Sequence, residues 1–136
     1  MELDVRSEEL GIGSEEFIIS QVDTLLEIPI HLEIKNVDIL DFKLIKSSNV
    51  ACLDADKLQY PLRLRRWQQG DWFVPFGMKG RKKLSDLFVD RKFSTRDKEQ
   101  LWLLISGDDI VWVVGFRVDA RYAVTEKTKS VKIFVL

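Results

Sequence analysis

The chain has 136 residues, of which 46% are hydrophobic and 32% charged, with a formal net charge of −1 at pH 7. This balance excludes a wholly disordered chain, and seven Gly and three Pro exclude collagen-like and low-complexity proteins. A single cysteine, Cys52, excludes an internal disulfide and a zinc site built from cysteines. No segment reaches the ~20 apolar residues of a membrane span, and the acidic N-terminal residues differ from a secretory signal. We therefore expect a cytoplasmic protein of one domain's size with no membrane partner.

The small net charge hides an uneven distribution of charged residues. Residues 1–60 carry five basic and thirteen acidic side chains, a net charge of −8, whereas residues 61–136 carry sixteen basic and nine acidic ones, a net charge of +7. Eight basic and three acidic residues fall between Lys79 and Lys98. A cationic segment on a nearly neutral protein favours an anionic partner. From charge alone, a solvated face with intrahelical ion pairs is an equally good interpretation.

The first half of the chain predicts a linker and then short strands. Residues 1–13, with Glu8-Glu9 and two glycines, are expected to be a linker remnant of a preceding domain, and residues 14–136 a single domain. Apolar and polar residues alternate in much of the segment after the linker, which is typical of strands with one buried face. The predicted strands cover residues 17–20, 28–35, 39–45, 49–53 and 62–65. In the last of these, Leu62 and Leu64 point inward, opposite Arg63 and Arg65.

The second half predicts two short helices and a return to strands. The spacing of Leu84, Leu87 and Phe88 predicts a helix over about 83–92. Ser94, with Asp97 three residues later, is typical of a helix N-terminus and predicts a second helix over about 95–101. The remaining strands are predicted at 102–105, 110–116 and 131–135, the first two joined by a tight turn. The expected fold class is α+β: a β-rich, sandwich-like domain of short, mainly antiparallel strands with two short helices.

No group of residues in the sequence predicts catalysis. The only histidine, His31, lies in an alternating run, where a surface position is more common than a general base. Cys52 is expected to be a small buried residue rather than a nucleophile, because it lies in a strand-like run. No Gly-rich nucleotide loop and no set of metal ligands with suitable spacing is present. We therefore expect no catalytic residue, metal or cofactor in this chain.

A binding surface for phosphates is the remaining candidate site. The loop Lys79-Gly80-Arg81-Lys82-Lys83 places four cations directly before a predicted helix, and its glycines leave room for a phosphate. Arginines of the strand at 62–65 extend the positive charge if that strand lies beside the loop. Trp67 shares their face and is a candidate for stacking on an unpaired base, with packing in the core as the alternative.

Three stretches of this half resemble a known family. They are the ordered string RxWxxGDxFxPxGMxGxKKLSD at 65–86, the run Asp90-Arg91-Lys92, and residues 110–121, which end in Asp119-Ala120-Arg121. Together they make residues 62–128 similar to the C-terminal domain of bacterial tRNA(Ile)-lysidine synthetases. Residues 14–61 match only in position and strand pattern. The sequence departs from the family at Trp72, where a basic residue is usual, and at 93–95, which lack a common proline.

The resemblance implies a function that composition does not show. Enzymes of this family are multidomain ligases that use ATP with Mg²⁺ to adenylate the wobble cytidine of an isoleucine tRNA. Lysine then displaces AMP and forms lysidine, which changes codon reading from AUG to AUA. Their catalytic N-terminal domain carries an SGGxDS phosphate loop, and this sequence contains no such string. The C-terminal domain of the family is β-rich, is similar to a tRNA-binding domain of phenylalanyl-tRNA synthetase, and engages the acceptor stem of the tRNA.

The implied partners are the acceptor stem of the isoleucine tRNA and the N-terminal and middle domains of the parent enzyme. The residues expected to bind tRNA are Arg63, Arg65, Arg66, Trp67, Lys79, Arg81, Lys82, Lys83, Arg91 and Lys92. The residues expected to shape the loop are Gly70, Asp71, Gly77 and Gly80. The alternative is a protein–protein or intramolecular docking module, in which the acidic half contacts the body of the enzyme without touching RNA.

Overall fold

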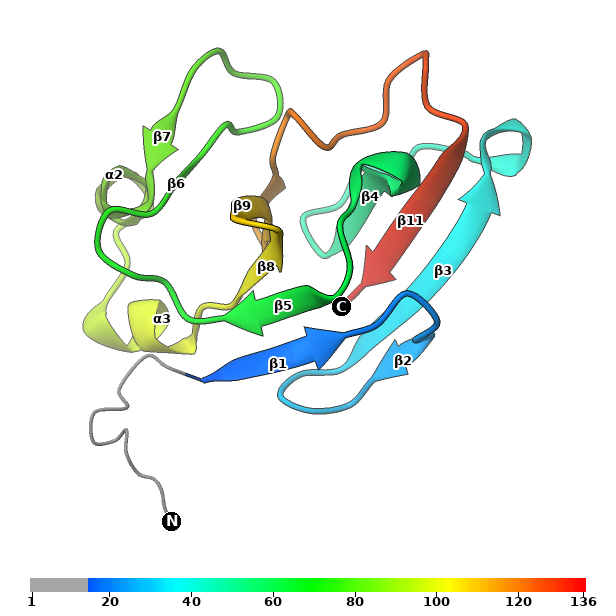
Figure 1. The fold of residues 1–136 in the computed structure, drawn as a ribbon. Coiled ribbons are helices and arrows are strands. Elements are labelled where there is room, and N and C mark those ends of the chain that lie inside the picture. Colours follow the sequence, from blue (N-terminus) through cyan, green and yellow to red (C-terminus); the bar gives the residue numbers. More distant parts are fainter. Residues whose placement is uncertain (1–14) are drawn as a thin grey trace.

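The computed structural model describes residues 15–136, so the linker predicted at 1–13 lies outside the described residues. The described residues form short strands, two α-helices and two single 3-10 turns, and Figure 1 shows how the strands and helices are arranged. The strands are β1 (Glu16–Ile19), β2 (Leu25–Leu26), β3 (Leu32–Asp38), β4 (Val50–Asp54), β5 (Leu62–Arg65), β6 (Trp72–Phe73), β7 (Lys82–Lys83), β8 (Leu103–Ser106), β9 (Asp109–Val113), β10 (Arg117–Val118) and β11 (Ser130–Val135). The helical elements are η1 (Ile39–Asp41), η2 (Ala55–Lys57), α2 (Leu84–Asp90) and α3 (Thr95–Gln100).

The described residues form three layers (Figure 1). A four-stranded sheet, β2-β3-β11-β4, packs on a five-stranded sheet, β1-β5-β8-β9-β10, and all their strand pairs are antiparallel. Leu64 and Trp112 of the larger sheet share one buried cluster with Leu32 and Phe134 of the smaller one. The other face of the larger sheet is covered by α2. These layers confirm the predicted sandwich-like α+β class.

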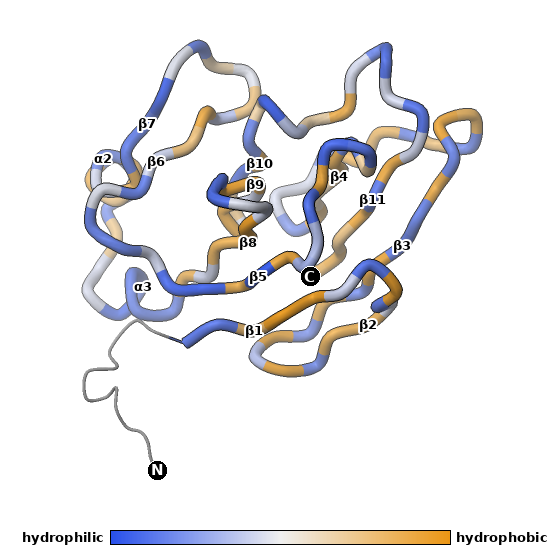
Figure 2. The backbone as a smooth tube through the Cα atoms, viewed as in Figure 1, coloured by the Kyte–Doolittle hydropathy of each residue, from blue (hydrophilic) through white to orange (hydrophobic). Residues whose placement is uncertain are grey.

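Strands β8 and β9 are buried on both faces because they lie in the middle layer. Leu104 belongs to the cluster between the two sheets, whereas its neighbours Leu103 and Ile105 pack against Leu84 and Phe88 of α2. Figure 2 shows hydrophobic residues along these two strands. Most of the apolar run 110–114 lies in β9, between β8 and β10, and the tight turn at 107–108 joins β8 to β9 as predicted.

Both predicted helices form, each slightly shorter than expected. Helix α2 ends at Asp90 rather than about residue 92, and Lys92 takes a positive φ of 55°. Helix α3 begins after the predicted cap: the Ser94 side chain accepts a hydrogen bond from the Asp97 backbone, and the Asp97 side chain accepts one from the Ser94 backbone. This reciprocal pair is a capping box, which satisfies two of the unpaired N–H groups at the helix start.

One predicted strand is shorter in the structure, and another does not form. Within 28–35, only the part from Leu32 onward is a strand, because β2 pairs with β3 and the residues between them form the connecting turn. Ile28 is consequently exposed. Residues 39–45 contain no strand: Asp38 accepts a hydrogen bond from the Leu40 backbone and starts η1, and Leu40 is 91% exposed. Alternation alone predicted a strand where no neighbouring strand pairs.

Candidate nucleic-acid interface

The basic loop, which comprises residues 74–83, runs from the end of β6 through β7 and is fastened to β10. The Phe76 backbone N–H donates to the Val118 carbonyl over 3.0 Å. Gly77 and Gly80 have φ values of 87° and 77°, a region that residues with a side chain rarely adopt. An added Cβ at either position would meet nothing within 4 Å, so the backbone conformation, and not space, calls for glycine.

A buried carboxylate anchors the start of the loop. Asp119 is fully buried, accepts a hydrogen bond from the Val74 backbone N–H over 2.9 Å, and holds the Arg121 guanidinium through Nε and Nη2 at 3.0 and 2.9 Å. This hydrogen bonding to Asp119 is the main cause that raises the pKa of Arg121. Arg121 in turn lies 4.8 Å from the ring centre of Trp72, in β6. Neither Asp119 nor Arg121 was among the site residues predicted from the sequence, although both lie in the segment that resembles the family.

Three cations of the basic loop face solvent. Lys79, Arg81 and Lys83 are exposed, and no carboxylate among residues 15–136 forms a salt bridge with any of them. The Arg81 guanidinium stacks on the Trp72 ring, with its carbon 4.0 Å from the ring centre. This contact holds one flat face of Arg81 and leaves its N–H groups at the edge available to a phosphate.

Other cations lie at the end of α2. Lys82 forms an ion pair with Asp90, which joins β7 to the last turn of the helix. Arg91 and Lys92 follow directly and are both exposed. The Arg91 guanidinium lies 5.6 Å from the centre of the Phe116 ring. The structure therefore links this second group of cations to the basic loop through Lys82, whose own charge is compensated.

Arg65, predicted to bind RNA, is paired inside the protein. Its two terminal nitrogens contact both oxygens of Asp71 at 2.9 and 3.0 Å, and the two side chains are only 11% and 12% exposed. Asp71 also accepts a hydrogen bond from the Gln68 backbone N–H over 2.7 Å. A bidentate pair of this kind fixes geometry strongly. Asp71, predicted to shape the loop together with Gly70, closes the turn after β5 and holds Arg65.

The neighbouring arginines also make internal contacts. Arg63 donates to the Gly107 carbonyl over 2.7 Å and to Glu16 over 3.3 Å. Arg66 stacks on the Trp102 ring at 3.6 Å and donates to the Leu101 carbonyl over 3.3 Å. Arg63 is thus held by β1 and the β8–β9 turn, and Arg66 by the segment that precedes β8.

Trp67 packs against the core, which was the alternative to stacking on an unpaired base. Its ring meets Phe88 of α2 edge to face at 4.9 Å between centres, and Phe88 stacks in turn on Phe93. This arrangement places Trp67 against the core under α2.

Among the described residues, no helix is long and apolar enough to cross a membrane. The same residues contain no cluster of three or more His, Cys, Asp or Glu side chains placed to hold a metal ion. Cys52 is buried and unpaired, and burial raises the pKa of its thiol, which disfavours the reactive thiolate. His31 lies on the surface, with Nδ1 2.6 Å from Glu27 and Nε2 3.6 Å from Glu33.

Comparison with known proteins places these features in one family. Residues 62–134 match the family profile described as the TilS substrate C-terminal domain. A tRNA(Ile)-lysidine synthase of Parabacteroides distasonis is 58% identical over 106 residues, which are 77% of this chain and 24% of that protein. A tRNA(Ile)-lysidine synthase of Dehalococcoides mccartyi is 35% identical over 124 residues, which are 90% of this chain and 24% of that protein. The chain thus spans about a quarter of the length of these relatives.

Solved structures share the fold. A crystal structure of a TilS C-terminal domain superposes with a TM-score of 0.74 at 19% identity, covering 89% of this chain and 95% of that one. An N-terminal fragment of the phenylalanyl-tRNA synthetase β-subunit from Pyrococcus horikoshii superposes with a TM-score of 0.54 at 23% identity, covering 63% of this chain and 27% of that one. The family match, the identities and the three-layered fold agree: the chain belongs to the family of C-terminal domains of tRNA(Ile)-lysidine synthases.

Proposed function

We propose that this chain is the substrate-docking part of a tRNA(Ile)-lysidine synthase and binds the acceptor-stem region of the isoleucine tRNA. The observation that supports this most directly is the exposed trio Lys79, Arg81 and Lys83, which project from a loop of fixed shape without a carboxylate partner among residues 15–136. Exposed cations bind phosphates because they release counterions from the nucleic acid. A double-stranded stem offers mainly phosphates and 2′-hydroxyls, since the major groove of A-form RNA is too narrow to read.

The chemistry of lysidine formation belongs, in this proposal, to parts of the enzyme outside this chain. The sequence holds no SGGxDS loop for the phosphates of ATP, so ATP, Mg²⁺ and lysine are assigned to the N-terminal domain of the parent enzyme. The contribution of this chain is to hold the tRNA while the wobble cytidine reacts elsewhere. We assign the enzyme to the cytoplasm, where its tRNA substrate is.

Under this proposal, only some of the residues that the sequence predicts to bind RNA are assigned to RNA. Lys79, Arg81, Lys83, Arg91 and Lys92 are assigned to RNA, because they are exposed. Arg63, Arg65, Arg66 and Trp67 are assigned to the scaffold that holds the loop, because each contacts other residues of the protein. Lys82 connects the two groups through Asp90.

A titration series in salt tests the assignment. The triple variant Lys79→Gln, Arg81→Gln and Lys83→Gln is compared with a matched control, Lys35→Gln, Lys43→Gln and Lys127→Gln, which removes three exposed cations elsewhere. Isoleucine tRNA and the same tRNA trimmed at its acceptor end serve as ligands. We expect the loop variant to bind full tRNA far more weakly. We also expect its plot of log K against log salt to be shallower, with a slope smaller in magnitude by about 2. Equal affinity of the two triple variants would contradict the proposal.

A docking role toward protein is the second candidate, and one observation favours it. Val22, Leu25 and Ile28 of the acidic half are large apolar side chains left exposed around β2. Apolar side chains grouped on a surface are typical of an interface. This face is assigned to contact with the parent enzyme, and Val22→Ser with Ile28→Ser is expected to weaken association with the remaining domains while leaving tRNA binding by this chain unchanged. Full association by that variant would refute the second role.

A further inference from the structure

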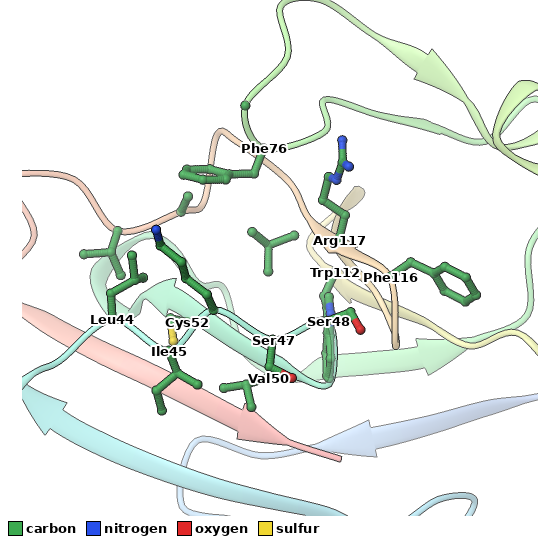
Figure 3. A pocket seen from close by; sticks show the side chains of 15 residues that line it. Leu44, Ile45, Ser47, Ser48, Val50, Cys52, Phe76, Trp112, Phe116 and Arg117 are labelled. Carbon is green, nitrogen blue, oxygen red and sulfur yellow. The ribbon is translucent and has the colours of Figure 1, made fainter. Parts of the chain in front are cut away.

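A cavity of about 620 Å³ opens beside the basic loop. Figure 3 shows Phe76 of the loop on one side of the opening and Leu44 and Ile45 on the other. Val50 and Cys52 of β4 line the cavity on the same side as Leu44 and Ile45. Trp112 of β9 also lines the cavity. Sites for small ligands have this size and this mostly apolar lining.

The cavity exposes apolar surface that nothing in the described chain covers. Phe76 is 53% exposed and Leu44 62% exposed, although both are large hydrophobic side chains. Trp112 is fully buried, yet its indole N–H has no hydrogen-bond partner anywhere within residues 15–136. A buried indole N–H normally has a partner. The cavity therefore offers the exposed ring of Phe76, whereas the Trp112 indole lies in its wall without exposed surface.

The charges around the cavity select the kind of ligand. Among residues 15–136, its lining contains Lys46 and Arg117 and no aspartate or glutamate. Lys46 is one of only five basic residues in the half of the chain whose net charge is −8. Arg117 also contacts the sulfur of Met78 in the basic loop at 3.5 Å. The ligand is expected to be anionic, with a flat apolar part that can stack on Phe76.

We propose that this cavity binds an unpaired nucleotide at the end of the RNA held by the basic loop. A nucleotide combines a flat base for Phe76 with a phosphate for Lys46 or Arg117, and it would lie against the wall that contains Trp112. Phe76 and Gly77 belong both to the cavity and to the basic loop, so one RNA strand reaches both without a break. The inference rests on the proposed function, because the basic loop must already hold the RNA.

Two RNA hairpins separate this inference from the proposed function. They share one stem, and only one of them carries a short single-stranded 3′ extension. We expect the unaltered chain to bind the extended hairpin about tenfold more tightly, and the extended hairpin alone to shift the indole N–H resonance of Trp112. Phe76→Ala and Arg117→Gln are expected to bind both hairpins with the affinity of the unaltered chain for the blunt one.

Matched controls remove an exposed side chain away from the cavity. Leu40→Ala truncates an apolar side chain that is 91% exposed, and Lys127→Gln removes an exposed positive charge. Both variants are expected to keep the tenfold preference for the extended hairpin. Equal binding of the two hairpins by the unaltered chain would overturn the cavity and leave the basic loop intact. A preference that survives in both Phe76→Ala and Arg117→Gln would also overturn it, since the extension would then bind elsewhere. Failure to bind either hairpin would overturn the proposed function, and this inference with it.

Discussion

Replacing Asp71 by asparagine tests whether Arg65 is a structural residue. Arg65 and Asp71 are each about one tenth exposed and share two hydrogen bonds, at 2.9 and 3.0 Å. Removing one partner of a buried ion pair costs about 3–5 kcal/mol, because it leaves an uncompensated charge in a poorly solvated place. Arg65 keeps one hydrogen bond to the Arg66 carbonyl, which places Asp71→Asn at the lower end, about 3 kcal/mol. For a chain of this size that corresponds to a loss of about 10 °C in Tm.

Urea and thermal unfolding followed by circular dichroism measure this loss. Glu16→Gln is the matched control: it removes the carboxylate facing Arg63, but that pair is 30% and 40% exposed, and exposed pairs contribute about 0–1 kcal/mol. Arg65→Met and the double variant with Asp71→Asn complete a cycle, in which the double variant is expected to lose less stability than the two single losses added together. If Asp71→Asn costs no more than Glu16→Gln, the assignment of Arg65 to the scaffold is wrong.

Three further variants probe the cap and the titrating groups. Ser94→Ala removes the capping box of α3 and is expected to cost about 1 kcal/mol by urea unfolding, whereas Ser85→Ala, an exposed serine inside α2, is expected to cost much less. Hydrogen bonds to Glu27 and then Glu33 raise the pKa of His31, so the stability that His31 contributes is present below about pH 6.5 and is lost as the pH rises through the folded-state pKa. His31→Gln is expected to abolish this part of the pH dependence of the unfolding free energy. Identical pH profiles of the variant and the unaltered chain would refute this. Burial lowers the pKa of Lys132, so the folded chain binds fewer protons than the unfolded one just below pH 10.5; the unfolding free energy is expected to rise with pH toward that value, and a Lys132→Met variant whose profile rises equally would contradict this.

The local patterns that predicted this fold correctly are those satisfied within a few residues. Helical spacing around Leu84 and Leu87, the cap at Ser94 and the turn at 107–108 all form as predicted. Alternation failed at residues 39–45, because a strand also needs a neighbour to pair with, and pairing is decided far along the chain. Strand β11, for example, lies between β3 and β4, which both belong to the first half of the chain. No local signal carries that arrangement.

The residues of the candidate site likewise divide into those that local sequence patterns predict and those whose contacts the sequence does not reveal. The sequence identified the cationic loop and its glycines, because charge and turn residues are read locally. It did not reveal that Asp71 compensates Arg65, although the two are six residues apart and separated by a predicted turn. Counting charges over a segment treats every cation as free, whereas a carboxylate folded back over a turn removes one. Asp119 and Arg121 were not predicted for a related reason. The Asp119 carboxylate accepts a hydrogen bond from the backbone of Val74, 45 residues earlier.

The distinction between paired and free cations sets a limit on RNA binding that a salt series measures. A phosphate contact contributes to the salt slope only if the cation releases counterions from the RNA, and a guanidinium already held by Asp71 makes no such contact without breaking its pair. Of the nine cations predicted from sequence, the five that the structure leaves exposed are Lys79, Arg81, Lys83, Arg91 and Lys92. For the blunt hairpin, which lacks a single-stranded extension, the slope of log K against log salt is therefore expected to lie between about −3.5 and −4.5, from about 0.7 to 0.9 for each of five contacts. A slope close to that for nine contacts would require Arg63, Arg65, Arg66 and Lys82 to leave their partners within the protein, and the assignment of the three arginines to the scaffold would then be wrong.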